Sequence, residues 1–229
     1  MRAEIDIGGY SGSMALTDDA STGFRPTGPS GVRGETPLEM QDPRTQLGQL
    51  LSGSIARKPF SELSDVTFHH RGAELVGHVL LDTVEEAGYT LDDFDAVGAL
   101  TAAAVPLVTS MITAAASRGQ DLDGFVMDFV YPSIKGPSIQ GKRVILVDSW
   151  LSEKSYVQTS SLVTLRHGNE LSLDFGIVEH EGAQVLAVAS LIGGPFETLK
   201  VIHPVTGDET DLPFIRAYDE DALRAPAAD

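Results

Sequence analysis

The stretch Lys142–Asp148 (KRVILVD) places four consecutive aliphatic residues between charged ones. A run without polar alternation is typical of a strand buried on both faces, as in a parallel sheet. Shorter apolar runs predict further strands at Asp95–Leu100, Gly124–Tyr131 and Gln184–Leu191. Helical segments separate these strands, so the sequence predicts an α/β fold with a doubly wound, mostly parallel sheet.

The helices are predicted from apolar spacing. Between Thr67 and Ala87, apolar residues recur at helical intervals, and Gly88 follows as a C-terminal cap. Pro106–Ala116 predicts a second helix and Thr45–Ser52 a short one. Ligands of doubly wound sheets bind beyond the carboxyl ends of the strands. The residues that follow Leu100, Tyr131 and Asp148 are therefore the candidates for a site.

The remaining segments predict additions to this domain. Ser161–Leu165 and Glu170–Phe175 have the pattern of a hairpin, Ile177–Gly182 that of a helix end, and Phe196–Pro213 that of a terminal hairpin. We expect an irregular N-terminal arm (1–45), an α/β domain (46–195) with a hairpin insertion near 161–175, and a C-terminal hairpin and tail (196–229). The last residues, Leu223–Asp229, are expected to be frayed.

Composition excludes several classes of function. The chain has no cysteine, which excludes a disulfide framework, a thiolate nucleophile and a zinc–cysteine site. Its formal charge of −17 opposes binding to nucleic acid or to anionic lipid. The apolar stretch Ala96–Ala116 is interrupted by Pro106 and hydroxyl residues, so we do not expect a membrane span. No secretory signal is visible, and we expect a cytoplasmic or other intracellular protein.

Several segments, in order, resemble the orotate phosphoribosyltransferases. They are Val66–Gly77 (VTFHHRGAELVG), Asp95–Leu107 (DAVGALTAAAVPL), Gly124–Val126, Gln140–Asp148 (QGKRVILVD) and Glu181–Ile192 (EGAQVLAVASLI). The resemblance implies the type I phosphoribosyltransferase fold. It also implies transfer of ribose 5-phosphate from phosphoribosyl pyrophosphate to orotate, with magnesium.

The resemblance assigns the segment after the KRVILVD strand to the phosphoribosyl-binding loop, where the family has two acids and a glycine-rich turn. This chain keeps one acid and no glycine, and Glu153 introduces a negative charge where a phosphate should lie. We therefore interpret the loop as vestigial and expect phosphate binding to be lost. Its vestigial phosphoribosyl-binding residues are Asp148, Ser149, Ser152, Lys154 and Ser155.

The two segments implied to bind pyrophosphate also depart from the family pattern. Met127-Asp128 stands where the family has Arg-Lys, and alanines replace glycine after Thr101. The vestigial pyrophosphate-binding residues are Thr101, Ala102 and Lys135. For the orotate contacts the resemblance offers only Leu51-Ser52-Gly53, Phe60 and the cations Arg57 and Lys58. The alternative is that the two cations are surface residues on a connecting segment.

No residue is predicted to be catalytic and none to bind a metal. Adjacent histidines such as His69-His70 point in different directions, and the other histidines lack ligand spacing. Trp150 is expected to fill the pocket at the strand's end or, less favourably, to offer a stacking platform for a base.

These departures favour a repurposed, non-catalytic protein with a structural, assembly or regulatory role and no cofactor. We expect a homo-oligomer or a subunit of a larger assembly joined through the arm. The alternative is an active phosphoribosyltransferase of nucleotide metabolism with an altered substrate, which needs Mg²⁺. A third possibility is a sensor that binds a nucleotide or phosphosugar without turnover.

Overall fold

The computed structural model describes residues 40–56, 63–128, 133–152, 163–166, 170–173, 176–202 and 206–225. All of them belong to one compact unit, Thr36–Asp229. Most of the predicted N-terminal arm lies outside the described residues, and so do Arg57, Lys58 and Phe60. The same holds for Glu153, Lys154 and Ser155 of the predicted phosphoribosyl loop.

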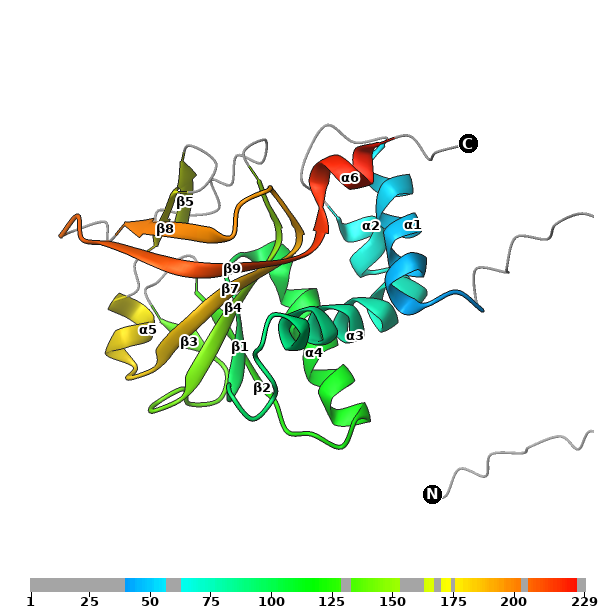
Figure 1. The fold of residues 1–229 in the computed structure, drawn as a ribbon. Coiled ribbons are helices and arrows are strands. Elements are labelled where there is room, and N and C mark those ends of the chain that lie inside the picture. The colour runs from blue at the N-terminus through cyan, green and yellow to red at the C-terminus, as the bar shows by residue number, and fades with distance from the viewer. Residues whose placement is uncertain are drawn as a thin grey trace, which may run out of the picture. The chain divides into compact units, whose positions relative to one another are not determined.

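The described strands form one sheet in the order β3-β2-β1-β4-β7-β9-β8-β6-β5 (Figure 1). Neighbours from β2 through β1, β4 and β7 to β9 are parallel, which confirms the predicted mostly parallel sheet. The strands are β1 Ala96–Ala99, β2 Asp123–Met127, β3 Ile134–Lys135, β4 Arg143–Leu151, β5 Val163–Arg166, β6 Glu170–Leu173, β7 Gln184–Gly193, β8 Thr198–Ile202 and β9 Glu209–Asp219.

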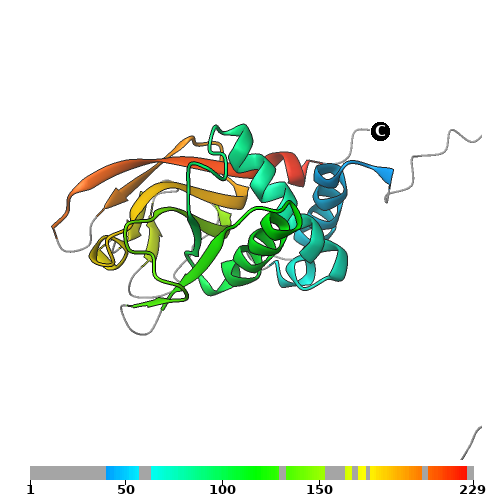
Figure 2. The same ribbon diagram turned by 90° about the horizontal axis from the view of Figure 1, so that it is seen from below.

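Helices cover both faces of the sheet. The helices are α1 Pro43–Ile55, α2 Ser64–Thr67, α3 His70–Glu86, α4 Val105–Ser117, α5 Gly176–His180 and α6 Glu220–Arg224. Helices α1, α3 and α4 share a core with Ile145 and Val147 of β4, whereas α5 packs with Val144 and Leu146 on the opposite face. Figure 2 shows α3 and α4 side by side on their face of the sheet. The four aliphatic residues of the KRVILVD run, 144–147, are completely buried, as expected for the central strand.

Helix α3 follows its predicted pattern. Leu75, Val76, Val79, Leu80 and Val84 are buried along one face. The helix ends at Glu86, and Gly88 has a φ of +95°, the left-handed conformation that suits glycine after a helix. The predicted helical segment is broken at Phe68 and His69, between α2 and α3.

Strand β4 is longer than predicted, and strand β2 is shorter. Strand β4 continues three residues beyond Asp148, because Trp150 and Leu151 pair with Ile192 and Gly193 of β7. The prediction that Asp148 ends this strand is therefore wrong. Strand β2 ends at Met127, and the antiparallel β3 follows it.

The predicted hairpins are confirmed as β5–β6 and β8–β9. Strand β9 also runs on to Asp219 and pairs in parallel with β7, so the C-terminal hairpin continues the main sheet. Helix α6 follows directly, and the expectation of fraying at Leu223 and Arg224 is wrong, because both residues lie in this helix. No helix among the described residues has the length and apolar character needed to span a membrane.

Candidate functional site

The carboxyl end of β1 is tied to β4 by a hydroxyl and a carboxylate. The chain leaves β1 at Leu100, whose amide donates to the carbonyl of Val147 at 2.9 Å. The next residue, Thr101, donates its hydroxyl to Oδ1 of Asp148 at 2.8 Å. Both side chains are buried, at 1% and 2% exposure. The fold thus brings together two residues that the sequence assigned to different vestigial loops.

The two oxygens of Asp148 have different surroundings. Oδ1 accepts from Thr101 and from the backbone amide of Ser149 at 2.6 Å. Oδ2 is buried and has no hydrogen-bond partner among the described residues. Burial raises the pKa of Asp148 from its ordinary 3.8 to about 6, and the hydrogen bonds from Thr101 and Ser149 oppose that rise. A buried carboxylate oxygen without a donor is costly, and it suits a ligand that brings one.

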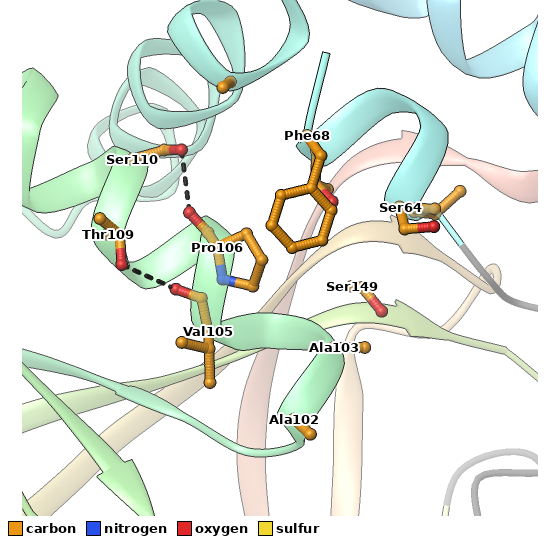
Figure 3. Close-up of a pocket in the computed structure, with 12 residues that line it drawn as sticks. Ser64, Phe68, Ala102, Ala103, Val105, Pro106, Thr109, Ser110 and Ser149 are labelled. Carbon is orange, nitrogen blue, oxygen red and sulfur yellow. Dashed lines mark hydrogen bonds between the residues drawn. The ribbon is translucent and has the colours of Figure 1, made fainter. Parts of the chain in front are cut away.

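A cavity of about 630 Å³ opens beside this pair, within the usual range for small-molecule sites. It lies between the α2–α3 segment and the start of α4 (Figure 3). Ser149 lines the cavity, and its backbone amide donates to the carboxylate of Asp148. A single residue therefore connects the cavity to this carboxylate. The lining residues are Leu63, Ser64, Thr67, Phe68, Ala73, Ala102, Ala103, Val105, Pro106, Thr109, Ser110 and Ser149.

The alanines of the predicted pyrophosphate loop form a 3-10 turn, η2 Ala102–Ala104. The 3-10 conformation is right-handed, so the loop turns without the positive φ that would require glycine. Ala102 and Ala103 are exposed and line the cavity, while Ala104 is buried. The alanines therefore keep the turn and present methyl groups to the cavity.

The other predicted site residues lie apart from the cavity lining. Lys135 sits on the short strand β3 and pairs with Asp128 at 3.4 Å, and the lysine is 65% exposed. Ser152 is buried and its hydroxyl is 3.3 Å from Nε1 of Trp150. Leu51 is fully buried in the core and is not among the described residues that line the cavity.

Trp150 neither fills the cavity nor lines it. Its Nε1 donates to Glu220 of α6 at 3.2 Å, and the guanidinium of Arg224 lies 5.3 Å from the ring centroid. The expectation of a plug or a platform is wrong, because the extension of β4 carries Trp150 beneath α6. Sequence reasoning also missed Phe68, whose 76% exposure at the α2–α3 break leaves its ring at the cavity. The sequence offered no signal for this residue, because the break between α2 and α3 falls inside the segment predicted as one helix.

Metal-binding groups do not gather in the described part of the chain. No cluster of three or more histidine, aspartate or glutamate side chains occurs there. His69 and His70 are exposed, and their rings contact each other with centroids 4.3 Å apart. Asp148 is the described residue whose free oxygen could join a cation that a substrate brings with it.

The fold is that of the type I phosphoribosyltransferases. The structure superposes with a TM-score of 0.53 on orotate phosphoribosyltransferase of Mycobacterium tuberculosis H37Rv in complex with 5-phospho-α-D-ribosyl 1-diphosphate, at 19% identity over 82% of this chain and 95% of that one. Orotate phosphoribosyltransferases of Streptomyces coelicolor and Streptomyces avermitilis are each 31% identical over 199 residues, which cover 84% of this chain and 97% of each relative. The chain belongs to the orotate phosphoribosyltransferase family. No protein-family model matches it.

These relatives overturn the hypothesis of a repurposed, non-catalytic protein. They carry the name of an enzyme and match this chain over nearly their whole length. That hypothesis gave most weight to the missing glycines and to Glu153, in a segment that lies outside the described residues. The alternative, an active phosphoribosyltransferase, agrees better with the relatives.

Proposed function

We propose that this chain is a phosphoribosyltransferase of nucleotide metabolism with an altered acceptor substrate. It transfers ribose 5-phosphate from phosphoribosyl pyrophosphate to a nitrogenous base. Membership of the family supports the reaction class. The observation that carries the proposal is the buried Oδ2 of Asp148, unpartnered among the described residues beside a cavity of ligand size. A ribose hydroxyl is the donor that this oxygen lacks.

Asp148 positions the ribose in this scheme. Thr101 and the amide of Ser149 both donate to Oδ1, so the carboxylate is held in one orientation with Oδ2 directed away from them. A hydrogen bond from a hydroxyl to an ionised carboxylate is roughly twice as strong as one between neutral groups. The acceptor nitrogen then forms a bond to C1 of the ribose, and the C1–O bond to pyrophosphate breaks with its electron pair on the leaving group.

Magnesium fits the same site. Mg²⁺ binds through one or two carboxylates together with substrate phosphates and keeps several waters. Asp148 would supply one carboxylate oxygen to such a cation, which does not need the three-residue cluster that the described chain lacks. When bound, Mg²⁺ would neutralise negative charge on the departing pyrophosphate.

Asp148→Asn tests the proposal. The amide can place a donor where the ribose hydroxyl needs an acceptor, so we expect kcat/KM for phosphoribosyl pyrophosphate to fall by about 10² to 10³. Release of pyrophosphate, with Mg²⁺ and a panel of pyrimidine and purine acceptors, is the measurement. Asp123→Asn is the matched control, since Asp123 lies at the start of β2, away from the carboxyl ends of the strands. Equal loss in both variants, or no release above the blank for the parent, would contradict the proposal.

Two further expectations accompany the proposed function. We propose an intracellular location, which a cysteine-free chain and a role in nucleotide metabolism both suit.

We also keep the prediction of a homo-oligomer, or of a subunit of a larger assembly, joined through the N-terminal arm, because that arm lacks the apolar periodicity of a core of its own. Light scattering on the full chain, and on a chain that lacks residues 1–35, checks the second expectation.

A further inference from the structure

The twelve side chains of the described residues that line the cavity are all uncharged. Arg71 follows Phe68 by three residues, but its guanidinium bonds to the amide oxygen of Gln46 at 2.9 Å and pairs with Glu74 at 3.6 Å. The described lining therefore contains no cation that could neutralise a carboxylate. A ligand carboxylate placed there would lose water and gain no opposite charge from these described residues, which is unfavourable.

Two of the hydroxyls that line the cavity are placed to accept hydrogen bonds. Thr109 donates its hydroxyl to the carbonyl of Val105 at 3.1 Å, and Ser110 donates to the carbonyl of Pro106 at 2.9 Å (Figure 3). Each hydroxyl has a single hydrogen, so once it is committed to the helix its oxygen can only accept. A ligand that carries N–H groups matches these oxygens.

The remaining walls are apolar and suit a flat ring. The ring of Phe68 lies at the cavity opposite Pro106, and it is 76% exposed in the protein alone (Figure 3). Ala102, Ala103 and Ala73 add methyl groups. A planar heterocycle can cover the Phe68 ring and remove this apolar surface from water.

We propose that the cavity binds an uncharged, planar, N–H-bearing heterocycle as the phosphoribosyl acceptor, in place of the anionic orotate. This inference rests on the proposed function. Ser149 joins the cavity to Asp148, so an acceptor here lies beside the ribose. Its ring nitrogen forms the bond to C1, pyrophosphate leaves with the electron pair of the broken C1–O bond, and the N–H proton passes to solvent.

Uracil and orotate form the test pair, because orotate is uracil with a carboxylate on carbon 6. We expect titration calorimetry on the full chain to give uracil a Kd at least about tenfold lower than that of orotate, a difference of about 1.4 kcal/mol. With phosphoribosyl pyrophosphate and Mg²⁺, pyrophosphate release should show the same preference in kcat/KM.

A matched pair of lysine variants tests whether the cavity sets this preference. Thr109 and Thr113 stand one turn apart on α4, both are exposed, and both donate to the carbonyl four residues earlier. Thr109 lines the cavity, and Thr113 is not among the lining residues. We expect Thr109→Lys to shift the ratio of the two Kd values at least about tenfold towards orotate. Thr113→Lys should keep the parent's ratio.

The outcomes separate this inference from the proposed function. Orotate binding as tightly as uracil, binding of neither, or equal shifts in both lysine variants would overturn the inference. Pyrophosphate release with orotate as the better substrate also overturns it but supports the transferase. Preferential uracil binding that follows Thr109→Lys, without pyrophosphate release, supports the ligand class and rejects the transferase.

Discussion

Asp148 shows how one residue can carry a cost in the free protein that a ligand removes. Its carboxyl is enclosed between β4 and the chain that leaves β1, with Oδ1 accepting from the Thr101 hydroxyl and from the amide and hydroxyl of Ser149, and with no donor from the described residues on Oδ2. Burial disfavours the charged form, and this is why the pKa rises to about 6 despite these hydrogen bonds. Near neutral pH the group is mostly ionised and remains short of one donor.

The pH dependence of stability follows from that pKa. The folded-state pKa of Asp148 lies above its ordinary 3.8, so the favourable contribution of its protonated form is complete below pH 3.8 and is lost as pH rises through about 6. The loss amounts to about 3 kcal/mol, since one pKa unit corresponds to about 1.36 kcal/mol. We measure the free energy of unfolding by denaturant titration without ligand. Between pH 4 and pH 7 this free energy should fall in the parent protein relative to that of Asp148→Asn. Parallel curves for the two proteins would contradict the assignment.

At the scale of elements, the close packing of α3 on α4 builds the cavity wall. Gly77 of α3 lies so near α4 that a Cβ built on it would come within 2.1 Å of the carbonyl oxygen of Ser110. Ser110 also lines the cavity. The position of that wall therefore depends on the absence of a side chain at residue 77.

Gly77→Ala tests this contact. Overpacking against backbone, which cannot rotate away as a side chain can, should lower the free energy of unfolding by about 1–3 kcal/mol. Gly53→Ala on α1 is the control, because a Cβ there meets nothing within 4 Å and alanine is the better helix former. It should raise the free energy of unfolding by about 0.5–1 kcal/mol. Chemical denaturation measures both, and a stabilised Gly77→Ala would show that α3 and α4 can separate without loss.

The elements themselves were largely predictable from sequence, and their ends were not. Apolar spacing located α3, and the run of four buried residues located β4. The extension of β4 past Asp148 depends on partners distant in sequence, Ile192 for pairing and Glu220 for the indole. Of the candidate site, Thr101, Asp148, Ser149 and Ala102 were identified through the family resemblance of the segments at β1 and β4. Phe68 was missed because only packing in three dimensions brings it to them.

At the scale of the whole molecule, the described C-terminal residues hold distant parts together. Glu220 is 3% exposed and accepts from Trp150 of β4, while Arg224 bonds to Glu220 at 3.0 Å. Tyr218, at the end of β9, donates its hydroxyl to the carbonyl of Arg44 in α1 at 2.7 Å. Strand β4, helix α1, strand β9 and helix α6 thus form one connected region (Figure 1).

Removal of residues 220–229 should uncover Trp150. It is the single tryptophan of the sequence, so its emission reports directly on α6. We expect a red shift of the fluorescence maximum and a loss of at least about 2 kcal/mol of stability, since a buried hydrogen bond and a cation–π contact disappear together. Removal of residues 226–229 alone is the control and should leave the spectrum unchanged. An unshifted spectrum after the longer truncation would mean that α6 does not cover the indole.

The position of β9 between β7 and β8 has a consequence for folding during synthesis of the protein. Strand β7, which borders the strand that carries Asp148, receives its second neighbour only when Glu209–Asp219 has been translated. Until that segment has been made, one edge of β7 stays open, and such edges invite pairing with other chains. A chain whose synthesis is interrupted before Glu209 therefore keeps an unfinished, aggregation-prone edge.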